Sequence, residues 1–157
     1  MFERILVCLD GSELAEQILP YAIEQAQRFN SKLTLLQVVT IPSSVYTASA
    51  ASELPQAGDM IAREIQKQES DARAYVDLVA KSLLKKGVSA EGVVLGPMHP
   101  GRAIVKYAQD NKIDLICIAT HGRSGLGRFV FGSVADRVLR DSGLPILLIK
   151  PKETKTK

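Results

Sequence analysis

The chain has 157 residues, 46% of them hydrophobic and 24% charged, which fits one globular domain with its own core. Its net charge of +3 is accounted for by four Lys and one Glu in Lys150–Lys157, so the remainder is neutral and nucleic-acid binding is disfavoured. With no apolar run long enough to span a membrane, no secretory leader, and two cysteines without metal-ligand spacing, we expect a soluble, cytoplasmic protein that does not bind membranes.

Short β-branched runs alternate with segments of helical period along the chain. Strands are predicted at 4–9, 32–39, 88–95, 113–119 and 145–149. Several are apolar almost throughout, which is typical of parallel strands buried on both faces, and Cys8 and Cys117 then become core thiols. The pattern predicts the α/β class: a single doubly wound, Rossmann-like domain over 1–150, with a five-stranded parallel sheet and helices on both faces. A disordered, Lys-rich tail is predicted at 151–157.

Four helices are predicted in the intervals between the strands. The first follows Asp10-Gly11-Ser12, with Ser12 as its cap and a kink at Pro20. The second covers about 60–86, the third begins near Pro100, and the fourth begins near Ser133. The connection 41–59 is long for this class, and either a functional cover or a disordered segment fits it.

Two loops follow the carboxyl ends of strands, where open parallel sheets bind ligands. The first is Asp10-Gly11-Ser12. A carboxylate there can accept hydrogen bonds from a ribose hydroxyl or an adenine amino group. Asp and Ser are equally suited to a turn that starts a helix, so the turn and the ligand interpretations both stand.

The second loop, 119–133, has four glycines within Gly122–Gly132. Glycines allow a ligand to approach the backbone closely, and the helix start at Gly132-Ser133 would point N–H groups and a positive dipole end into the loop. Arg123 and Arg128 add fixed positive charge. This combination predicts a phosphate-binding loop, the alternative being a merely flexible one.

Two common nucleotide enzymes are disfavoured by the same loops. The spacing from Gly127 to Gly132-Ser133 approaches a P-loop, but the Lys that reaches the outer phosphates is missing. The first strand lacks a Gly-x-Gly-x-x-Gly motif, and the chain has no room for a substrate domain, so a dehydrogenase is not expected. His121 and His99 are better explained as loop and turn residues than as general bases.

These motifs resemble, in order and over the whole length, the universal stress protein (UspA-like) family. The resemblance rests on the first strand and turn, 5–13, on 120–126, on Gly132-Ser133-Val134-Ala135 and on 144–148. The ATP-binding branch has a Gly, two residues, a second Gly, nine residues and then Gly-Ser or Gly-Thr. Gly122, Gly132 and Ser133 match that pattern, whereas Ala119 replaces the leading glycine.

The resemblance implies strand order 3-2-1-4-5 and a set of nucleotide-binding residues. Asp10 would face the ribose and base, and the Val38 backbone would lie against adenine. Gly122, Gly132, Ser133 and Val134 would hold the phosphates, and Ala119 and Arg123 complete the set of nucleotide-binding residues. The Ser133 hydroxyl could bind phosphate, cap its helix, or do both. No residue is identified as catalytic or metal-binding.

The expected function is therefore ATP binding, with or without Mg²⁺, by a stress-response module in which nucleotide shifts conformer populations. A homodimer is expected through the last strand, 145–149, because an uncharged apolar edge favours strand pairing. A slow ATPase or phosphotransferase, and a nucleotide-free structural dimer of the same fold, remain the alternatives.

Overall fold

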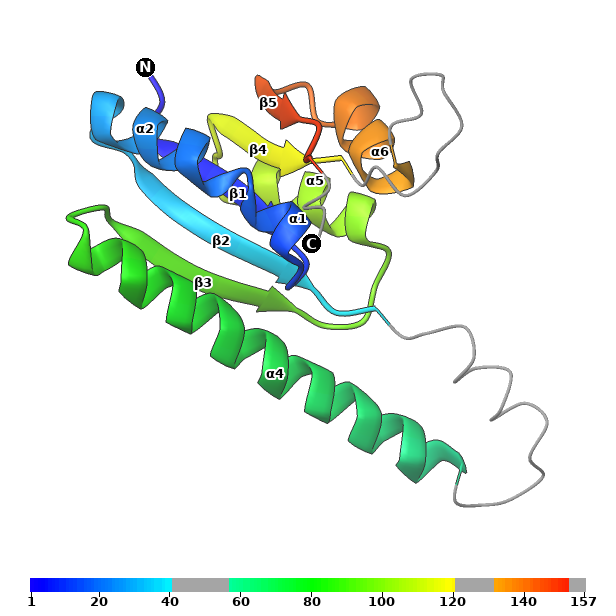
Figure 1. Cartoon of the computed structure of the whole chain (residues 1–157). Helices are drawn as coiled ribbons and strands as arrows, with labels where there is room; N and C mark the ends of the chain where they lie inside the picture. The colour runs from blue at the N-terminus through cyan, green and yellow to red at the C-terminus, as the bar shows by residue number, and fades with distance from the viewer. Residues whose placement is uncertain (41–56, 121–131, 153–157) are drawn as a thin grey trace.

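The computed structural model describes residues 1–40, 57–120 and 132–152. Within them, five parallel strands form one sheet in the order β3-β2-β1-β4-β5 (Figure 1). The strands are β1 Arg4–Leu9, β2 Lys32–Val38, β3 Ala90–Leu95, β4 Leu115–Ala119 and β5 Ile146–Ile149. The predicted fold class and strand order are confirmed, and each predicted strand is found within two residues of its expected ends.

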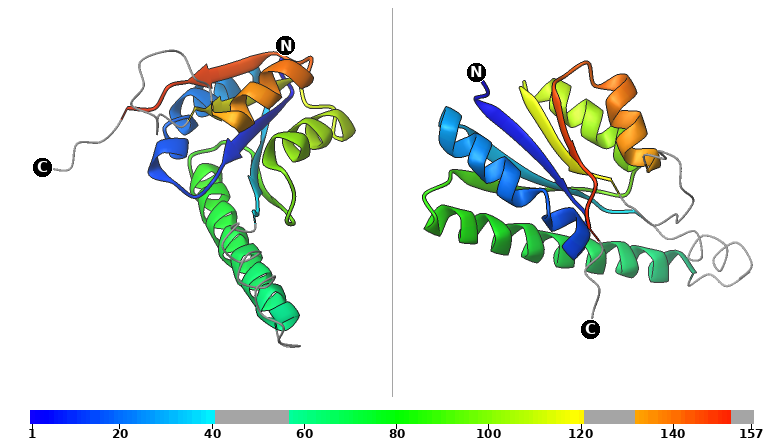
Figure 2. Two further views of the ribbon diagram at one scale, coloured as in Figure 1. Left: turned by 90° about the vertical axis from the view of Figure 1, so that its right-hand side faces the viewer. Right: turned by 45° about the horizontal axis from the view of Figure 1, so that its top comes forward.

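Helices cover both faces of this sheet (Figure 2). The described helices are α1 Glu13–Glu16, α2 Leu19–Phe29, α4 Ala57–Lys85, α5 Pro100–Asp110 and α6 Ser133–Asp141. Helices α1, α2 and α4 share one buried cluster with Ile5, Val7 and Leu9 of β1. Helices α5 and α6 share a second cluster with the alternate β1 residues Leu6 and Cys8. Because successive side chains of β1 point to opposite faces of the sheet, β1 contributes residues to both cores.

The first helix differs from its prediction as one kinked helix. It is two helices: α1 ends at Glu16 with Gln17 as its C-cap, and α2 begins at Leu19 after the N-cap Ile18, with Pro20 in its first turn. Proline has no N–H to donate to residue 16, but it is tolerated at a helix start, where the N–H groups have no intrahelical acceptor. A new helix, α2, therefore begins at Leu19, with Pro20 in its first turn.

Pro151 and Lys152, the first two residues of the predicted tail 151–157, lie in the described part of the chain. Pro151 is buried, and the Lys152 backbone exchanges two hydrogen bonds of 2.8 Å with the Gln17 side chain. These contacts hold the chain after β5 against the junction of α1 and α2. Residues 153–157 lie outside the described part. No helix in the described part is both long and apolar enough to cross a bilayer.

We predict that Gly92→Ala destabilises the domain by about 1 to 3 kcal/mol. A Cβ at Gly92 would lie 2.7 Å from Val76 Cγ2 and 3.1 Å from the Val76 backbone, so α4 would have to move away from β3. Chemical denaturation measures the change. Gly58→Ala in α4 is the control, because a Cβ there meets no described atom within 4 Å and alanine favours helix. Equal stability of Gly92→Ala and wild type would contradict the close packing.

Candidate functional site

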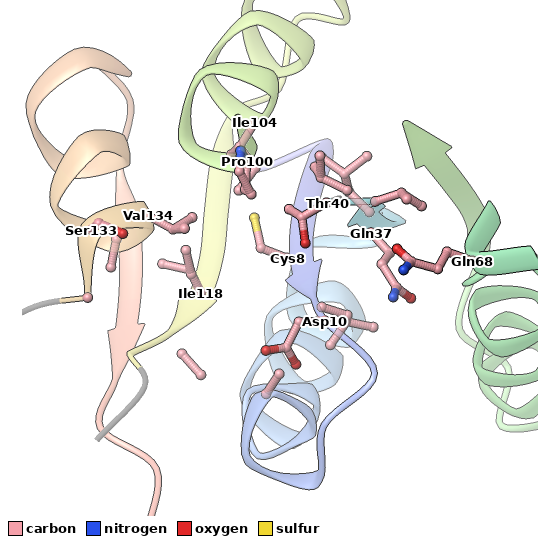
Figure 3. Close-up of a pocket in the computed structure, with 18 residues that line it drawn as sticks. Cys8, Asp10, Gln37, Thr40, Gln68, Pro100, Ile104, Ile118, Ser133 and Val134 are labelled. Carbon is pink, nitrogen blue, oxygen red and sulfur yellow. The ribbon is translucent and has the colours of Figure 1, made fainter. Parts of the chain in front are cut away.

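A cavity of about 600 Å³ opens at the carboxyl ends of β1, β2 and β4 (Figure 3). The starts of α5 and α6 and one side of α4 complete its wall. It is lined by Cys8, Leu9, Asp10, Ala15, Leu36, Gln37, Val38, Val39, Thr40, Gln68, Pro100, Ile104, Ile118, Ala119, Gly132, Ser133, Val134 and Ala135. A doubly wound sheet leaves a crevice here because the connections on either side of β1 turn toward opposite faces.

Asp10 forms the turn at the end of β1. Its Oδ1 accepts hydrogen bonds from the Ser12 N–H at 3.0 Å and the Ser12 hydroxyl at 2.6 Å, while Ser12 Oγ accepts from Ala15 N–H and caps α1. Gly11 has a φ of +79°, which L-residues rarely adopt. The turn interpretation is therefore confirmed, and the exposed carboxylate still lines the cavity, where it can serve a ligand as well.

Val38 lies where β2 extends past β1. The last registered pair of the β1–β2 ladder is Leu9 with Gln37, whereas Val38 is still paired with Leu95 of β3. On the β1 side, the Val38 backbone is thus beyond the end of the neighbouring strand. This position suits a main-chain contact to a planar group in the cavity.

The α6 start supplies the most polar part of the opposite wall. Gly132 occupies the N-cap position with φ −56°, and Ser133 is the first helical residue. The Gly132 carbonyl accepts from Asp136 N–H at 3.0 Å, and no side chain caps the helix. N–H groups in the first turn of a helix lack intrahelical acceptors, so this end favours an anion.

Close packing of α5 on α6 brings both helix starts to the same cavity. A Cβ on Gly101 would lie 2.8 Å from Arg137 Cβ and 3.5 Å from the Val134 carbonyl oxygen. Pro100 is in the first turn of α5, as predicted, and it contributes no N–H. Helix α6 is therefore the richer source of backbone donors.

The floor of the cavity is apolar and includes Cys8, Leu36, Ile104 and Ile118. Burial, with the neighbouring Cys117 second, raises the pKa of the Cys8 thiol. Burial also raises the pKa of Cys117 to about 12. Both thiols stay protonated at neutral pH and act as packing groups, as the sequence predicted.

The structure brings six of the eight predicted site residues to this one cavity: Asp10, Val38, Ala119, Gly132, Ser133 and Val134. Gly122 and Arg123 lie outside the described residues, as do Arg128 and His121. The Ala119 methyl belongs to the core cluster on the α1 face and is packed among apolar neighbours. The described residues contain no group of three or more His, Cys, Asp or Glu that could hold a metal ion.

Three polar residues of the cavity were missed from the sequence: Gln37, Thr40 and Gln68. A signal for Gln37 exists, because it continues the face of Leu33 and Leu35 in β2, where an apolar residue is expected. Gln68 lies on a helix that is amphipathic throughout. Nothing in its local sequence separates it from a solvent-exposed glutamine.

The chain is a doubly wound α/β domain with a cavity at its switch point, and comparison with known proteins identifies its family. The model of the universal stress protein family matches residues 1–150. The chain therefore belongs to that family.

Relatives match over nearly the whole chain. Universal stress protein MJ0531 of Methanocaldococcus jannaschii is 29% identical over 98% of this chain and 85% of its own length. Universal stress protein Sll1388 of Synechocystis is 28% identical over 95% of this chain and 98% of its own length.

Solved structures share the fold. The MJ0577 protein of M. jannaschii superposes with a TM-score of 0.78 at 24% identity, covering 98% of this chain and 99% of that one. A universal stress protein in complex with cAMP superposes at 0.61 with 20% identity, covering 96% and 98%. The Archaeoglobus fulgidus protein in complex with dAMP superposes at 0.60 with 18% identity, covering 96% and 98%.

We predict that Asp10→Ala lowers the free energy of unfolding by about 1 kcal/mol, because Ser12 loses its acceptor. Asp10→Asn keeps an oxygen at the Oδ1 position and should stay within about 0.5 kcal/mol of wild type. Thermal and denaturant melts of the ligand-free variants measure both values. Equal losses in the two variants would show that charge, and not the turn geometry, is what matters.

Proposed function

We propose that this chain binds an adenine nucleotide, with ATP as the expected ligand, in the cavity at the ends of β1, β2 and β4. The observation that carries the proposal is the pairing of an α6 start with the Asp10 turn across one cavity of about 600 Å³. That volume suits a small ligand. The solved structures of two universal stress proteins, one in complex with cAMP and one in complex with dAMP, add support from related chains.

The phosphates would lie at the α6 start. Gly132, Ser133 and Val134 place backbone N–H groups there, and the helix dipole favours negative charge. The Ser133 side chain is exposed at the first helical position and can donate its hydroxyl to a phosphate oxygen. Gly122 and Arg123 remain proposed phosphate contacts from the neighbouring loop, and Mg²⁺ would accompany the phosphates.

The ribose and base would lie between Asp10 and the end of β2. The Asp10 carboxylate lines this part of the cavity and would accept a hydrogen bond from a ribose hydroxyl. The Val38 backbone extends past β1 and would lie against the base. The apolar floor at Leu36, Ile104 and Ile118 would exclude water from the ligand.

Binding, rather than turnover, is the proposed activity. Asp10 is the one carboxylic acid among the described lining residues, and it is bonded to Ser12. Nucleotide would act by favouring the conformer that binds it more tightly, to the extent of its differential affinity. We propose that this switch operates in a homodimer formed through the β5 edge.

Calorimetry should give a dissociation constant of about 1 μM or lower for ATP, a binding free energy of about 8 kcal/mol. Gly132→Val should abolish that binding with an unchanged melting temperature. The described structure leaves open space around Gly132, whose φ of −56° also suits valine, so the new side chain can occupy the cavity without strain.

Gly132→Ala is the graded control and should weaken binding less than valine does. Normal ATP affinity in the valine variant would place the nucleotide elsewhere. No binding of ATP or AMP by the wild type at millimolar concentration would refute the proposed function and favour the structural dimer.

Light scattering should show a dimer that Leu148→Pro converts to monomer. The Pro145 carbonyl accepts from Ile116 N–H in β4, and the Ile149 carbonyl accepts from Thr120 N–H directly after β4. In a parallel ladder the backbone groups of Leu148 therefore face the outer edge of β5. Proline removes that outward N–H and leaves the β4 ladder intact. Leu148→Ala loses similar packing but keeps the N–H, and it should remain a dimer. A monomeric wild type at high micromolar concentration would contradict pairing through β5.

A further inference from the structure

Gln37 carries an unusual buried atom in the cavity. Its Oε1 is buried and has no hydrogen-bond partner, the one such side-chain atom among the described residues. Buried polar groups in native proteins are almost always paired. The atom is closed to solvent, so the Gln37 side chain, which lines the cavity, must turn its carboxamide toward an occupant for this oxygen to receive a donor.

The Gln37 carboxamide lies near the β1 turn. A Cβ on Gly11 would lie 3.8 Å from Gln37 Nε2, so the amide is in contact range of that turn. Figure 3 shows Gln37 and Gln68 on one side of the cavity and the α6 residues Ser133 and Val134 on the other. Gln68 is oriented by its own bond, Nε2 to Glu64 Oε1 at 3.0 Å. The cavity thus has a carboxamide side opposite the helix start.

The chemistry of the carboxamide side favours adenine. Guanine presents two acceptors, N7 and O6, on the edge that Arg or Lys reads, whereas glutamine suits the amino donor and ring acceptor of adenine. No Lys or Arg is among the described residues that line the cavity. A phosphate at the α6 start leaves the base to the opposite side, where Gln37 lies.

We propose that Gln37 is the base-selecting residue of this cavity, its Oε1 accepting a hydrogen bond from the exocyclic amino group of adenine. This inference rests on the proposed nucleotide binding and adds to it which base the cavity selects. Gln37 would act beside the Val38 backbone. A main-chain contact to the base does not depend on which side chain residue 38 carries.

The test compares ATP with purine riboside triphosphate, which lacks only the amino group. Wild type should bind ATP about tenfold more tightly than the analogue, the ratio expected for one buried hydrogen bond. Gln37→Met preserves side-chain length and removes both polar atoms. The variant should bind the two nucleotides equally, because its affinity for ATP falls while its dissociation constant for the analogue stays at the wild-type value.

A stability measurement separates selection from a structural role. Ligand-free Gln37→Met should melt at or above the wild-type temperature, because an unpaired buried acceptor is removed; a glutamine needed for the fold would give a lower one. Gln66→Met, the same change at an exposed α4 position outside the cavity lining, should alter neither affinity.

The outcomes distinguish the two claims. A wild type that binds ATP and the analogue equally, or a Gln37→Met variant that keeps the wild-type ratio, would overturn base selection by Gln37 and leave nucleotide binding standing. A wild type that binds neither nucleotide would overturn the proposed function, and the role of Gln37 with it.

Discussion

Burial of β1 on both faces and pairing along both of its edges is the constraint from which the site follows. Residues Ile5–Leu9 are at most 7% exposed, and β1 pairs with β2 on one side and with β4 on the other. The chain therefore adds β2 and β3 on one side of β1 and then crosses to the other side, where it adds β4 and β5. Right-handed crossovers then place α1, α2 and α4 on one face and α5 and α6 on the other. The connections diverge beyond the carboxyl end of β1, and the cavity lies between them.

The same constraint fixes which groups face the cavity. Strand ends supply short backbone segments at Asp10 and Val38, and close packing at Gly101 aligns the α5 and α6 starts. These groups belong to rigid elements, which suits binding that must distinguish one ligand from another. The unpaired oxygen of Gln37 has a stability cost, and its place in an otherwise apolar face of β2 fits the selective role proposed for it.

Much of this architecture could be predicted from the sequence because its signals are local. The apolar runs defined the strands, and Asp10-Gly11-Ser12 and Pro100 marked helix starts that the structure confirms. Strand order required the family resemblance, since periodicity does not specify neighbours. The break between α1 and α2 was missed because Pro20 permits either a kink or a restart. Gln68 could not be found at all, because its approach to the cavity depends on how α4 packs.

The central claim is that one cavity holds an adenine nucleotide, and a crystal structure of the protein grown with saturating ATP tests it most directly. The account predicts density for the nucleotide at the carboxyl ends of β1, β2 and β4, with phosphates at Gly132–Val134 and the base beside Gln37. An empty cavity at millimolar ATP, or a nucleotide bound elsewhere on the domain, would contradict it.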